Sequence, residues 1–287
     1  MEHLGSGSYS LSISPRRGAE RHHGSCFFLQ QFECRLGVWC IKLRCRTSPR
    51  ITQQQFKTKA GRPRPPSVSQ SRRRAHINAI RTTVEHDLPS ALILEDDLDW
   101  AVRLREQMLT FALSTRTLTQ PLAIKKDPEN TYADSSFPDS SSSNKVTEIL
   151  YDDRPTTIQP SNSAYGDDWD ILWLGHCEMQ APTQNTPALS KGRVILAADP
   201  SVTLDDTVEV DGEPAQNQTR IYHHVHDPAC TLAYAVSQRG ARRILYKVSQ
   251  RNETEAVDDV LKALCDGTGG EERNLVCITT QPNLFSR

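Results

Sequence analysis

Three adjacent acidic residues, Glu95, Asp96 and Asp97, directly follow the apolar run Ala91-Leu-Ile-Leu94. Such a run is typical of a strand buried on both faces. Side chains alternate along an extended chain, so the spacing predicts that Glu95 and Asp97 share one side and Asp96 points to the other. Two converging carboxylates repel each other unless a cation joins them. Because Mn²⁺ and Mg²⁺ prefer oxygen ligands and often bind substrate phosphates as well, the pattern predicts a divalent-cation site for a nucleotide diphosphate.

The same acidic residues have a structural interpretation, because a helix dipole favours acids at its N-terminus. Asp99 fits that interpretation as an N-cap. The helix behind it is indicated by apolar residues at helical spacing, namely Trp100, Leu104, Met108 and Phe111. For Glu95 to Asp97, the four apolar residues immediately before them favour a site at the C-terminal end of a strand.

Histidines, cysteines and a glycine supply further candidates. One expected strand carries three histidines, His223, His224 and His226. Alternation places His224 and His226 on the same face, where one of them either completes a metal shell or lies at a solvated strand end. Gly175 allows a close approach of the backbone to a ligand, and His176 fits either ligand contact or structural hydrogen bonding. No cysteine forms a CxxC pair, which argues against zinc. Cys230, Cys265 and Cys277 are therefore interpreted as small core residues, and Trp100, Trp169 and Trp173 as core aromatics.

The elements that must position these residues begin after a basic segment. Residues 1–74 carry 15 Lys/Arg and 3 Asp/Glu without sustained periodicity, which predicts a disordered segment. Its arginines are scattered without interleaved aromatics, so nucleic-acid binding is not expected. No apolar run is long enough to span a bilayer, and no signal peptide is evident at Met1. Two sequons, at Asn217 and Asn252, would matter only in a secretory compartment.

Residues 75–287 alternate between helical and strand patterns, which predicts a single α/β domain with a mixed sheet. Helices are expected over 76–88, ended by Pro89, and around Ala241–Val248 and Val257–Leu264. Strands are expected over 91–94, 169–175, 193–197, 207–210, 220–225, 231–237 and 275–279. The polar stretch 127–168, with Ser140 to Ser143, is interpreted as a mobile surface insertion.

Three stretches in order carry a family resemblance. They are the segment from His76 through Ser90-Ala-Leu-Ile-Leu-Glu-Asp-Asp97, the segment Asp168-Trp-Asp-Ile-Leu-Trp-Leu-Gly-His176, and the segment Thr231-Leu-Ala-Tyr-Ala-Val-Ser-Gln-Arg-Gly-Ala241. Together they resemble glycosyltransferase family 25, which includes lipopolysaccharide-biosynthesis transferases and collagen galactosyltransferases. The chain is most similar to fungal members, over residues 75–285. The chain has no GxSxG, P-loop or Rossmann glycine motif, which argues against hydrolases, kinases and dehydrogenases.

The resemblance implies a GT-A-like fold and inverting transfer of a hexose, such as galactose, from a UDP-sugar to a hydroxyl of a glycan or protein. It implies Mn²⁺ (or Mg²⁺) held by Glu95 and Asp97, with His76 matching the histidine of the preceding helix. Asp258 in Val257-Asp-Asp-Val-Leu261 is similar to the family's late motif aspartate and is the candidate catalytic base. We take His76, Asp96, Gly175 and His176 as candidate substrate-binding residues. The family also suggests the lumen of the endoplasmic reticulum or Golgi.

The N-terminus departs from the family. Members begin with a strand that carries an Ile-Asn-Leu-type motif and an arginine, and residues 1–74 contain nothing similar. Arg72-Arg-Arg-Ala75 replaces the Cys-x-x-Ser-like residues before His76. An aberrant or truncated N-terminus that lacks part of the donor site is therefore expected. This motivates an alternative function, a catalytically silent binding module, beside a third hypothesis of phosphoryl transfer or hydrolysis by the same carboxylates.

Overall fold

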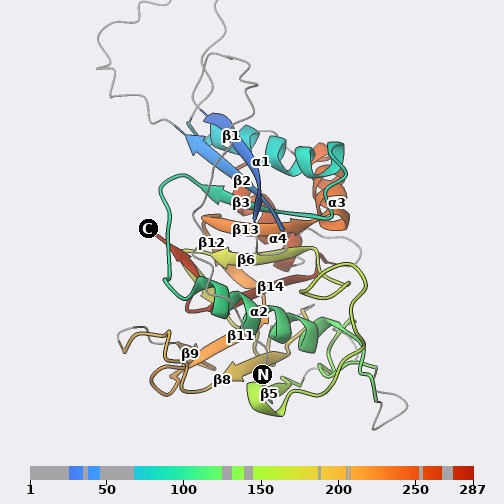
Figure 1. Cartoon of the computed structure of the whole chain (residues 1–287), viewed down its shortest axis with the longest axis vertical. Coiled ribbons are helices and arrows are strands. Elements are labelled where there is room, and N and C mark those ends of the chain that lie inside the picture. Colours follow the sequence, from blue (N-terminus) through green and yellow to red (C-terminus); the bar gives the residue numbers. More distant parts are fainter. Residues whose placement is uncertain are drawn as a thin grey trace, which may run out of the picture.

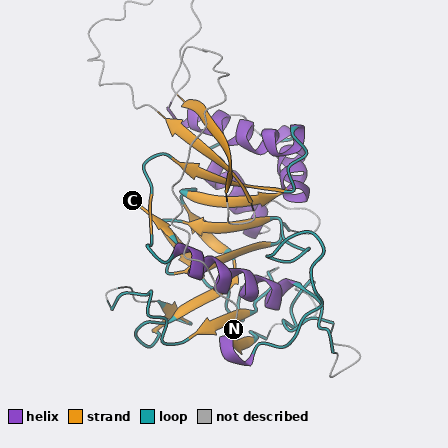
Figure 2. Cartoon of the chain, viewed as in Figure 1, coloured by secondary structure: helices purple, strands orange, loops and turns teal. Residues whose placement is uncertain are grey.

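The structure, a computed structural model, describes residues 26–34, 38–45, 68–124, 131–138, 145–186, 189–204, 206, 208–251, 255–266 and 274–287. These residues form a mixed α/β fold in which a large sheet has helices on both faces (Figure 1; Figure 2). The predicted α/β class and the mixed sheet flanked by helices are confirmed. In the order in which they lie, its nine described strands are β1 (Cys26–Cys34), β2 (Val38–Cys45), β3 (Ser90–Glu95), β13 (Ala233–Ser237), β6 (Ile171–Gly175), β14 (Cys277–Gln281), β11 (Arg220–His224), β8 (Arg193–Leu196) and β5 (Glu148–Leu150).

Helices and three short strand pairs complete the described fold. The helices are α1 (Val68–Glu85), α2 (Leu104–Thr119), α3 (Gln238–Ser249) and α4 (Val257–Asp266), with a 3₁₀ turn η1 (Tyr151–Asp153). The pairs are β9 (Glu209–Val210) with β10 (Glu213–Pro214), β7 (Glu178–Gln180) with β12 (His226–Ala229), and β4 (Asp99–Trp100) with β15 (Phe285–Ser286). None of the described helices is long and apolar enough to cross a membrane.

Strand directions determine which residues meet at one edge of the sheet. Strand β2 runs parallel to β3, β13 is antiparallel to both β3 and β6, and β14 is parallel to β6. Strands β2, β3, β6 and β14 therefore run in one direction. Their C-terminal ends, including Glu95 and Gly175, lie at the same edge of the sheet.

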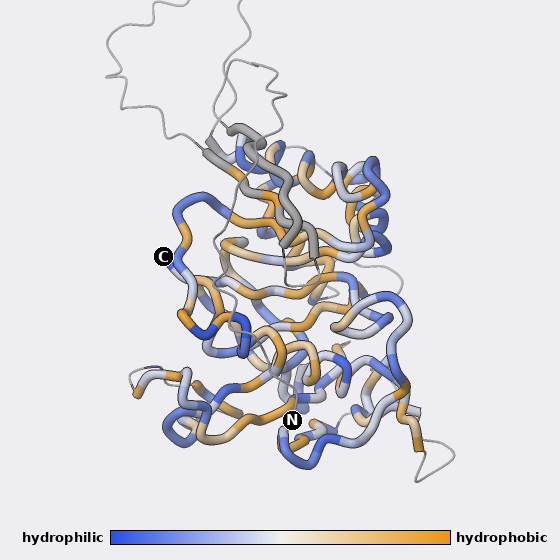
Figure 3. Tube along the Cα trace, in the orientation of Figure 1, coloured by the Kyte–Doolittle hydropathy of each residue, from blue (hydrophilic) through white to orange (hydrophobic). Residues whose placement is uncertain are grey.

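The sheet is buried on both faces, which explains the continuous apolar runs of its central strands. On one face, Ile93, Ile171 and Tyr234 pack with residues of α1, α3 and α4. On the other face, Leu92 and Leu172 pack with Met108, Phe111 and other residues of α2 and its neighbouring loops. Hydrophobic positions accordingly follow the inner strands in Figure 3. The expected strands around 91–94, 169–175 and 231–237 and the helix over 257–264 are confirmed, with small shifts of their ends.

The prediction that residues 1–74 lack structure is wrong for part of this segment. Strands β1 and β2 form an antiparallel hairpin, β2 pairs with β3, and α1 begins at Val68. Ile41 and Leu43 are fully or almost fully buried in the core under α1. The alternation of Ile41 and Leu43 around Lys42 is the period-2 signal that sequence reasoning missed. The remainder of the predicted disordered segment lies outside the described residues.

Two expectations about residues 99 and 100 are wrong. Asp99 does not cap a helix: α2 begins only at Leu104, after Arg103, and no side chain caps it. Asp99 instead accepts a hydrogen bond from the backbone N–H of Trp100 at 2.8 Å. Trp100 is 57% exposed rather than part of the core, and it lies in β4, which pairs with β15. Trp169 and Trp173 are buried, as predicted.

The stretch 127–168 is not simply a mobile insertion, because several of its described residues are part of the core. Phe137 and Tyr165 are buried beside α2. Strand β5 extends the sheet by pairing parallel with β8. Ser140 to Ser143 lie outside the described residues. The prediction of mobility missed the scattered aromatic residues, whose burial fixes this stretch against the sheet.

The four cysteines after residue 75 form two disulfides, which the interpretation of Cys230, Cys265 and Cys277 as small core residues did not anticipate. Cys177 is bonded to Cys230 and Cys265 to Cys277. The first bridge joins the end of β6 to the turn before β13, and the second joins α4 to β14. Cys265 and Cys277 are buried as expected, but they are buried as a cross-link between a helix and the sheet.

Candidate functional site

Glu95 is the last residue of β3, and its carboxylate is largely shielded from solvent by basic side chains. Arg72 on α1 donates to both carboxylate oxygens, with Nε 3.1 Å from Oε1. Arg287, at the other side, donates from Nη2 to Oε2 at 2.6 Å. Burial alone would raise the pKa of Glu95, but the neighbouring His76 and Arg72 outweigh burial and hold the pKa below its usual value. Glu95 is therefore an ionised carboxylate at neutral pH.

His76 and Tyr234 continue this arrangement into the core. His76 Nε2 lies 3.7 Å from Glu95 Oε1, and His76 Nδ1 is hydrogen-bonded to the Tyr234 hydroxyl at 2.9 Å. Both rings are buried and stacked, with centroids 5.7 Å apart. Burial, and then the charge of Glu95, raises the pKa of Tyr234 well above its usual value, so its hydroxyl keeps its proton. His76, a residue of α1, is thus held against Tyr234 of β13 and faces Glu95 of β3.

Asp97 faces the same guanidinium as Glu95. Strand β3 ends at Glu95, and Asp96 and Asp97 lie in a turn, so strict strand alternation does not decide their directions. Nevertheless, Arg287 Nε lies 3.1 Å from Asp97 Oδ2 while its Nη2 contacts Glu95. Asp97 is mostly exposed, whereas Asp96 is half-buried. The pairing of β15 with β4 carries the chain past this turn and positions Arg287.

One cation thus already contacts two carboxylates at the C-terminal end of β3. Arg287 contacts Glu95 through Nη2 and Asp97 through Nε, so the two carboxylates lie on either side of one guanidinium. Within the described residues, no group of three or more His, Cys, Asp and Glu side chains converges as a metal site. A divalent cation here would take its remaining ligands from water and substrate phosphates, as Mg²⁺ and Mn²⁺ commonly do.

Gly175 and His176 lie at the same edge, but protein atoms fill the space around them. A Cβ at Gly175 would come within 3.0 Å of Ala233 N and of Phe285 atoms, so the close approach is to the chain itself. His176 is buried, with Nε2 3.2 Å from the Thr280 carbonyl oxygen, and burial lowers its pKa. Its own carbonyl accepts a hydrogen bond from Asn283 at 2.9 Å. These contacts favour the structural role for His176 that the sequence left open.

Asp258 lies in the first turn of α4, beside the exposed Asp259. Asp258 is half-buried, and the apolar face of α4 that sequence spacing predicted is buried. Arg73 Nη1 donates to the Glu255 carbonyl oxygen at 2.9 Å, just before α4. Because Arg73 adjoins Arg72 on α1, the start of α4 lies at the same end of the fold as Glu95.

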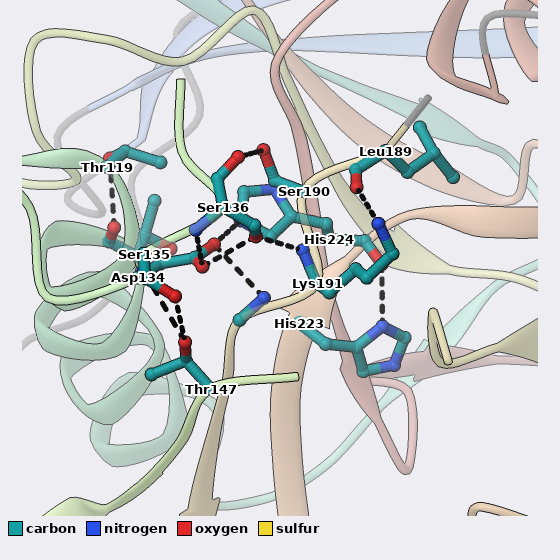
Figure 4. A network of polar contacts seen from close by, with 12 residues as sticks. Thr119, Asp134, Ser135, Ser136, Thr147, Leu189, Ser190, Lys191, His223 and His224 are labelled. Carbon is teal, nitrogen blue, oxygen red and sulfur yellow. Dashed lines mark hydrogen bonds and ion pairs between the residues drawn. The ribbon is translucent and has the colours of Figure 1, made fainter. Parts of the chain in front are cut away.

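The interpretation of the histidine cluster as a solvated strand end is wrong for His223 and His224, because both side chains are buried. Figure 4 shows the polar contacts around them. His224 Nε2 lies 3.0 Å from Oδ2 of the fully buried Asp134, and Gly192 N donates to the same oxygen at 3.0 Å. Ser136 donates to Asp134 Oδ1 from both its backbone and its hydroxyl. This network fixes the segment around Asp134 against β11, and so His224 has a structural partner.

The prediction that His224 and His226 share one face of a strand is wrong, because they belong to different strands and contact different acids, Asp134 and Asp266. His226 begins β12, after β11 has ended at His224, and its Nδ1 lies 3.7 Å from Asp266 Oδ1. Burial lowers the pKa of His223 to about 3, so His223 is neutral at physiological pH. Its Nδ1 hydrogen bonds the His224 carbonyl oxygen at 2.7 Å.

We expect Asp134→Asn to destabilise the fold by about 3 kcal/mol at pH 7, because it removes the buried carboxylate that is hydrogen-bonded by His224, Ser136 and Gly192. Burial would raise the pKa of Asp134, but hydrogen bonds from His224 and Ser136 hold it below its usual value. A lowered pKa contributes stability above the unfolded pKa of about 3.9, and this stability is lost as the pH falls through the folded pKa. Urea unfolding of wild type and variant between pH 7 and pH ~3 should show their difference shrinking on acidification. The exposed Asp153→Asn is the control; a pH-independent difference would contradict the prediction.

Sequence reasoning missed three residues of this site: Arg72, Tyr234 and Arg287. Arg72 was visible as a departure from the family, and Tyr234 lies inside a stretch that carries the resemblance. Arg72 and Tyr234 are brought close to Glu95 only by the packing of α1 and by the pairing of β13 with β3. Arg287 gave no local signal, because it is 192 residues from Glu95 in sequence.

Comparisons with known proteins do not assign the chain to a class: no family model matches it, and no curated protein does.

Proposed function

We propose that this chain is a metal-dependent inverting glycosyltransferase that moves a hexose from a UDP-sugar to a hydroxyl of a glycan or protein. The observation that carries the proposal is the contact of Glu95 and Asp97 with one shared cationic group at the end of a buried strand. Carboxylates in this position suit the binding of a cation–diphosphate complex.

The β2–α1–β3 unit supports a GT-A-like interpretation of the sheet. Strand β2 precedes α1 and pairs in parallel with β3, the strand that carries Glu95. The sequence predicted that the chain lacks the first strand of the family. Strand β2 would take the place of that strand, although its Val38-Trp-Cys-Ile-Lys-Leu sequence differs from the family's motif. The donor nucleotide would bind at the C-terminal ends of β2 and β3, where ligands of open α/β sheets commonly bind.

Each residue of the site has a distinct role in the proposed reaction. Glu95 and Asp97 would hold Mn²⁺ or Mg²⁺, which as a Lewis acid would neutralise the charge on the diphosphate leaving group. His76 and Tyr234 keep Glu95 oriented through the contacts described above. Asp258 would remove the proton of the acceptor hydroxyl, since a carboxylate that is not bound to metal is the better base. Asp96 would contact the substrate beside the metal ligands.

A secretory compartment is the proposed location, and the two disulfides support it. Disulfides form and persist in oxidising compartments and are rare in the cytosol. Cys177–Cys230 and Cys265–Cys277 both link segments that are part of the fold around the site. This agrees with the lumenal location that the resemblance implies.

A catalytically silent binding module remains the second candidate, and one observation favours it. Arg72 and Arg287 already neutralise Glu95, so the carboxylate does not need a metal in order to be stable. Isothermal titration of UDP, with and without Mn²⁺, separates the two functions. Mn²⁺-dependent UDP binding supports the transferase, and its absence supports the silent module. Release of free sugar from UDP-sugars without an acceptor would indicate hydrolysis instead.

We expect Arg287→Gln to raise the affinity for Mn²⁺ about 3- to 10-fold, because the guanidinium competes with the metal for both carboxylates. Exposed ion pairs are worth about 0.2–1 kcal/mol each, so the two pairs of Arg287 together contribute about 0.7–1.4 kcal/mol, which is roughly 3- to 10-fold in affinity. Electron paramagnetic resonance of free Mn²⁺ measures this affinity without any substrate. Arg242→Gln, at an exposed position of α3, is the matched control. Lower Mn²⁺ affinity in Arg287→Gln would show that Arg287 does not compete with the cation.

A further inference from the structure

The tripeptide Asn217-Gln-Thr219 satisfies the acceptor pattern for N-glycosylation, and its asparagine lies on the surface of the fold. It occupies the turn between β10 and β11, in which Gln218 has a φ of 59°. Asn217 is exposed, and among the described residues nothing hydrogen-bonds its side-chain amide. The amide nitrogen is therefore open to solvent in the folded chain.

Such tripeptides are common by chance, so the pattern needs an independent observation. The disulfides Cys177–Cys230 and Cys265–Cys277 provide it, because they indicate folding in an oxidising compartment. In secreted proteins the same pattern marks an acceptor asparagine in a surface loop. We propose that Asn217 carries an N-linked glycan.

The turn that holds Asn217 is hydrogen-bonded to a neighbouring loop, and a glycan there would leave the candidate active site free. The Gln218 carbonyl oxygen accepts from the backbone N–H of Asp199 at 2.8 Å, which fixes the turn to the loop after β8. Strand β11, which follows the turn, is separated from β3 by β14, β6 and β13. At about 4.8 Å between neighbouring strands, the glycan begins about 19 Å from the strand that carries Glu95.

The loop next to this turn gives the glycan a surface to cover. Gln218 Nε2 contacts the Val202 carbonyl oxygen at 3.4 Å, and Leu204, two residues further on, is 67% exposed. A bulky hydrophilic glycan on Asn217 would shield this apolar side chain from other proteins. The glycan would therefore act on solubility, and the binding of UDP and metal does not depend on it.

Mass spectrometry of the natural protein tests the assignment directly. Trypsin releases residues 194–220 as one peptide in which Asn217 is the only asparagine, and residues 252–262 as a separate peptide with the second sequon. Treatment with peptide N-glycosidase in ¹⁸O-water converts a glycosylated asparagine to a heavy-labelled aspartate. We expect the label at residue 217. Recovery of peptide 194–220 with unlabelled asparagine alone, or labelling of Asn252 alone, would overturn the proposal.

Matched variants of the full chain, expressed in the same cells, test the acceptor pattern. Asn217→Gln and Thr219→Ala should lose the glycosidase-sensitive shift in gel mobility that is due to Asn217, whereas Thr219→Ser should retain it. Because Thr219 is buried, Asn217→Gln controls for misfolding of Thr219→Ala. A shift in Asn217→Gln equal to that of wild type would exclude Asn217. The readout is independent of transferase activity, so the glycan and the proposed function can fail separately.

Discussion

Mn²⁺-dependent binding of UDP is expected to be abolished in Asp97→Asn, while the fold is retained. Asparagine keeps the size of the side chain but removes one of the two negative charges that would hold the cation. Asp97 is 57% exposed, and its ion pair with Arg287 is at the surface. Such pairs contribute about 0–1 kcal/mol to stability, so the unfolding free energy should change little. Isothermal titration with UDP and Mn²⁺, together with urea unfolding, measures both quantities.

Asp99→Asn is the matched control for this experiment. Asp99 is exposed, lies two residues further along and makes the same change of charge, but its side chain accepts from the backbone of Trp100. It should bind UDP with Mn²⁺ as the wild type does. Unchanged Mn²⁺-dependent binding in Asp97→Asn would remove Asp97 from the metal site. Equal loss in Asp99→Asn would point to a general effect of charge at this edge.

The buried strands were the most predictable part of the fold. The runs ending at Leu94 and Gly175 are continuous and apolar because both faces of the sheet are covered, by α1, α3 and α4 on one side and α2 on the other. The start of α2 was misjudged because Trp100 continues the helical spacing of Leu104. The actual conformation depends on pairing with β15, almost 200 residues away in sequence, which no local pattern encodes.

Long-range contacts also explain the other errors. Cys177 and Cys230 are 53 residues apart in sequence, and their pairing requires β6 and β13 to be adjacent. Strand β2 was overlooked because charged residues interrupt its apolar positions, although Ile41 and Leu43 alternate correctly. The candidate site shows the same division. The carboxylates at Glu95 and Asp97 were visible locally, whereas Arg287, which contacts both, was not.

The role of Asp258 has a structural alternative that the experiment must separate from catalysis. Acidic residues in the first turn of a helix are stabilised by the helix dipole, by about 0.3–1 kcal/mol each. Asp258 and Asp259 both occupy the first turn of α4, so both are subject to this effect. They differ in exposure: Asp259 is exposed, whereas Asp258 is half-buried next to the core residue Val257. Asp259→Asn therefore reproduces the electrostatic effect on the helix without changing the proposed base.

Asp258→Asn is expected to reduce turnover by about 10²-fold or more, while the affinity for UDP and Mn²⁺ stays close to that of the wild type. An amide cannot accept the proton of the acceptor hydroxyl, but it preserves the shape of the side chain. Arg73 of α1 contacts Glu255 just before α4, and the adjacent Arg72 contacts Glu95, so Asp258 lies at the end of the fold where the donor would bind. Initial-rate kinetics with a UDP-hexose and an acceptor, beside titration of UDP and Mn²⁺, separates turnover from binding. Equal losses of turnover and binding would make Asp258 a structural residue, and full activity, as expected for Asp259→Asn, would exclude it as the base.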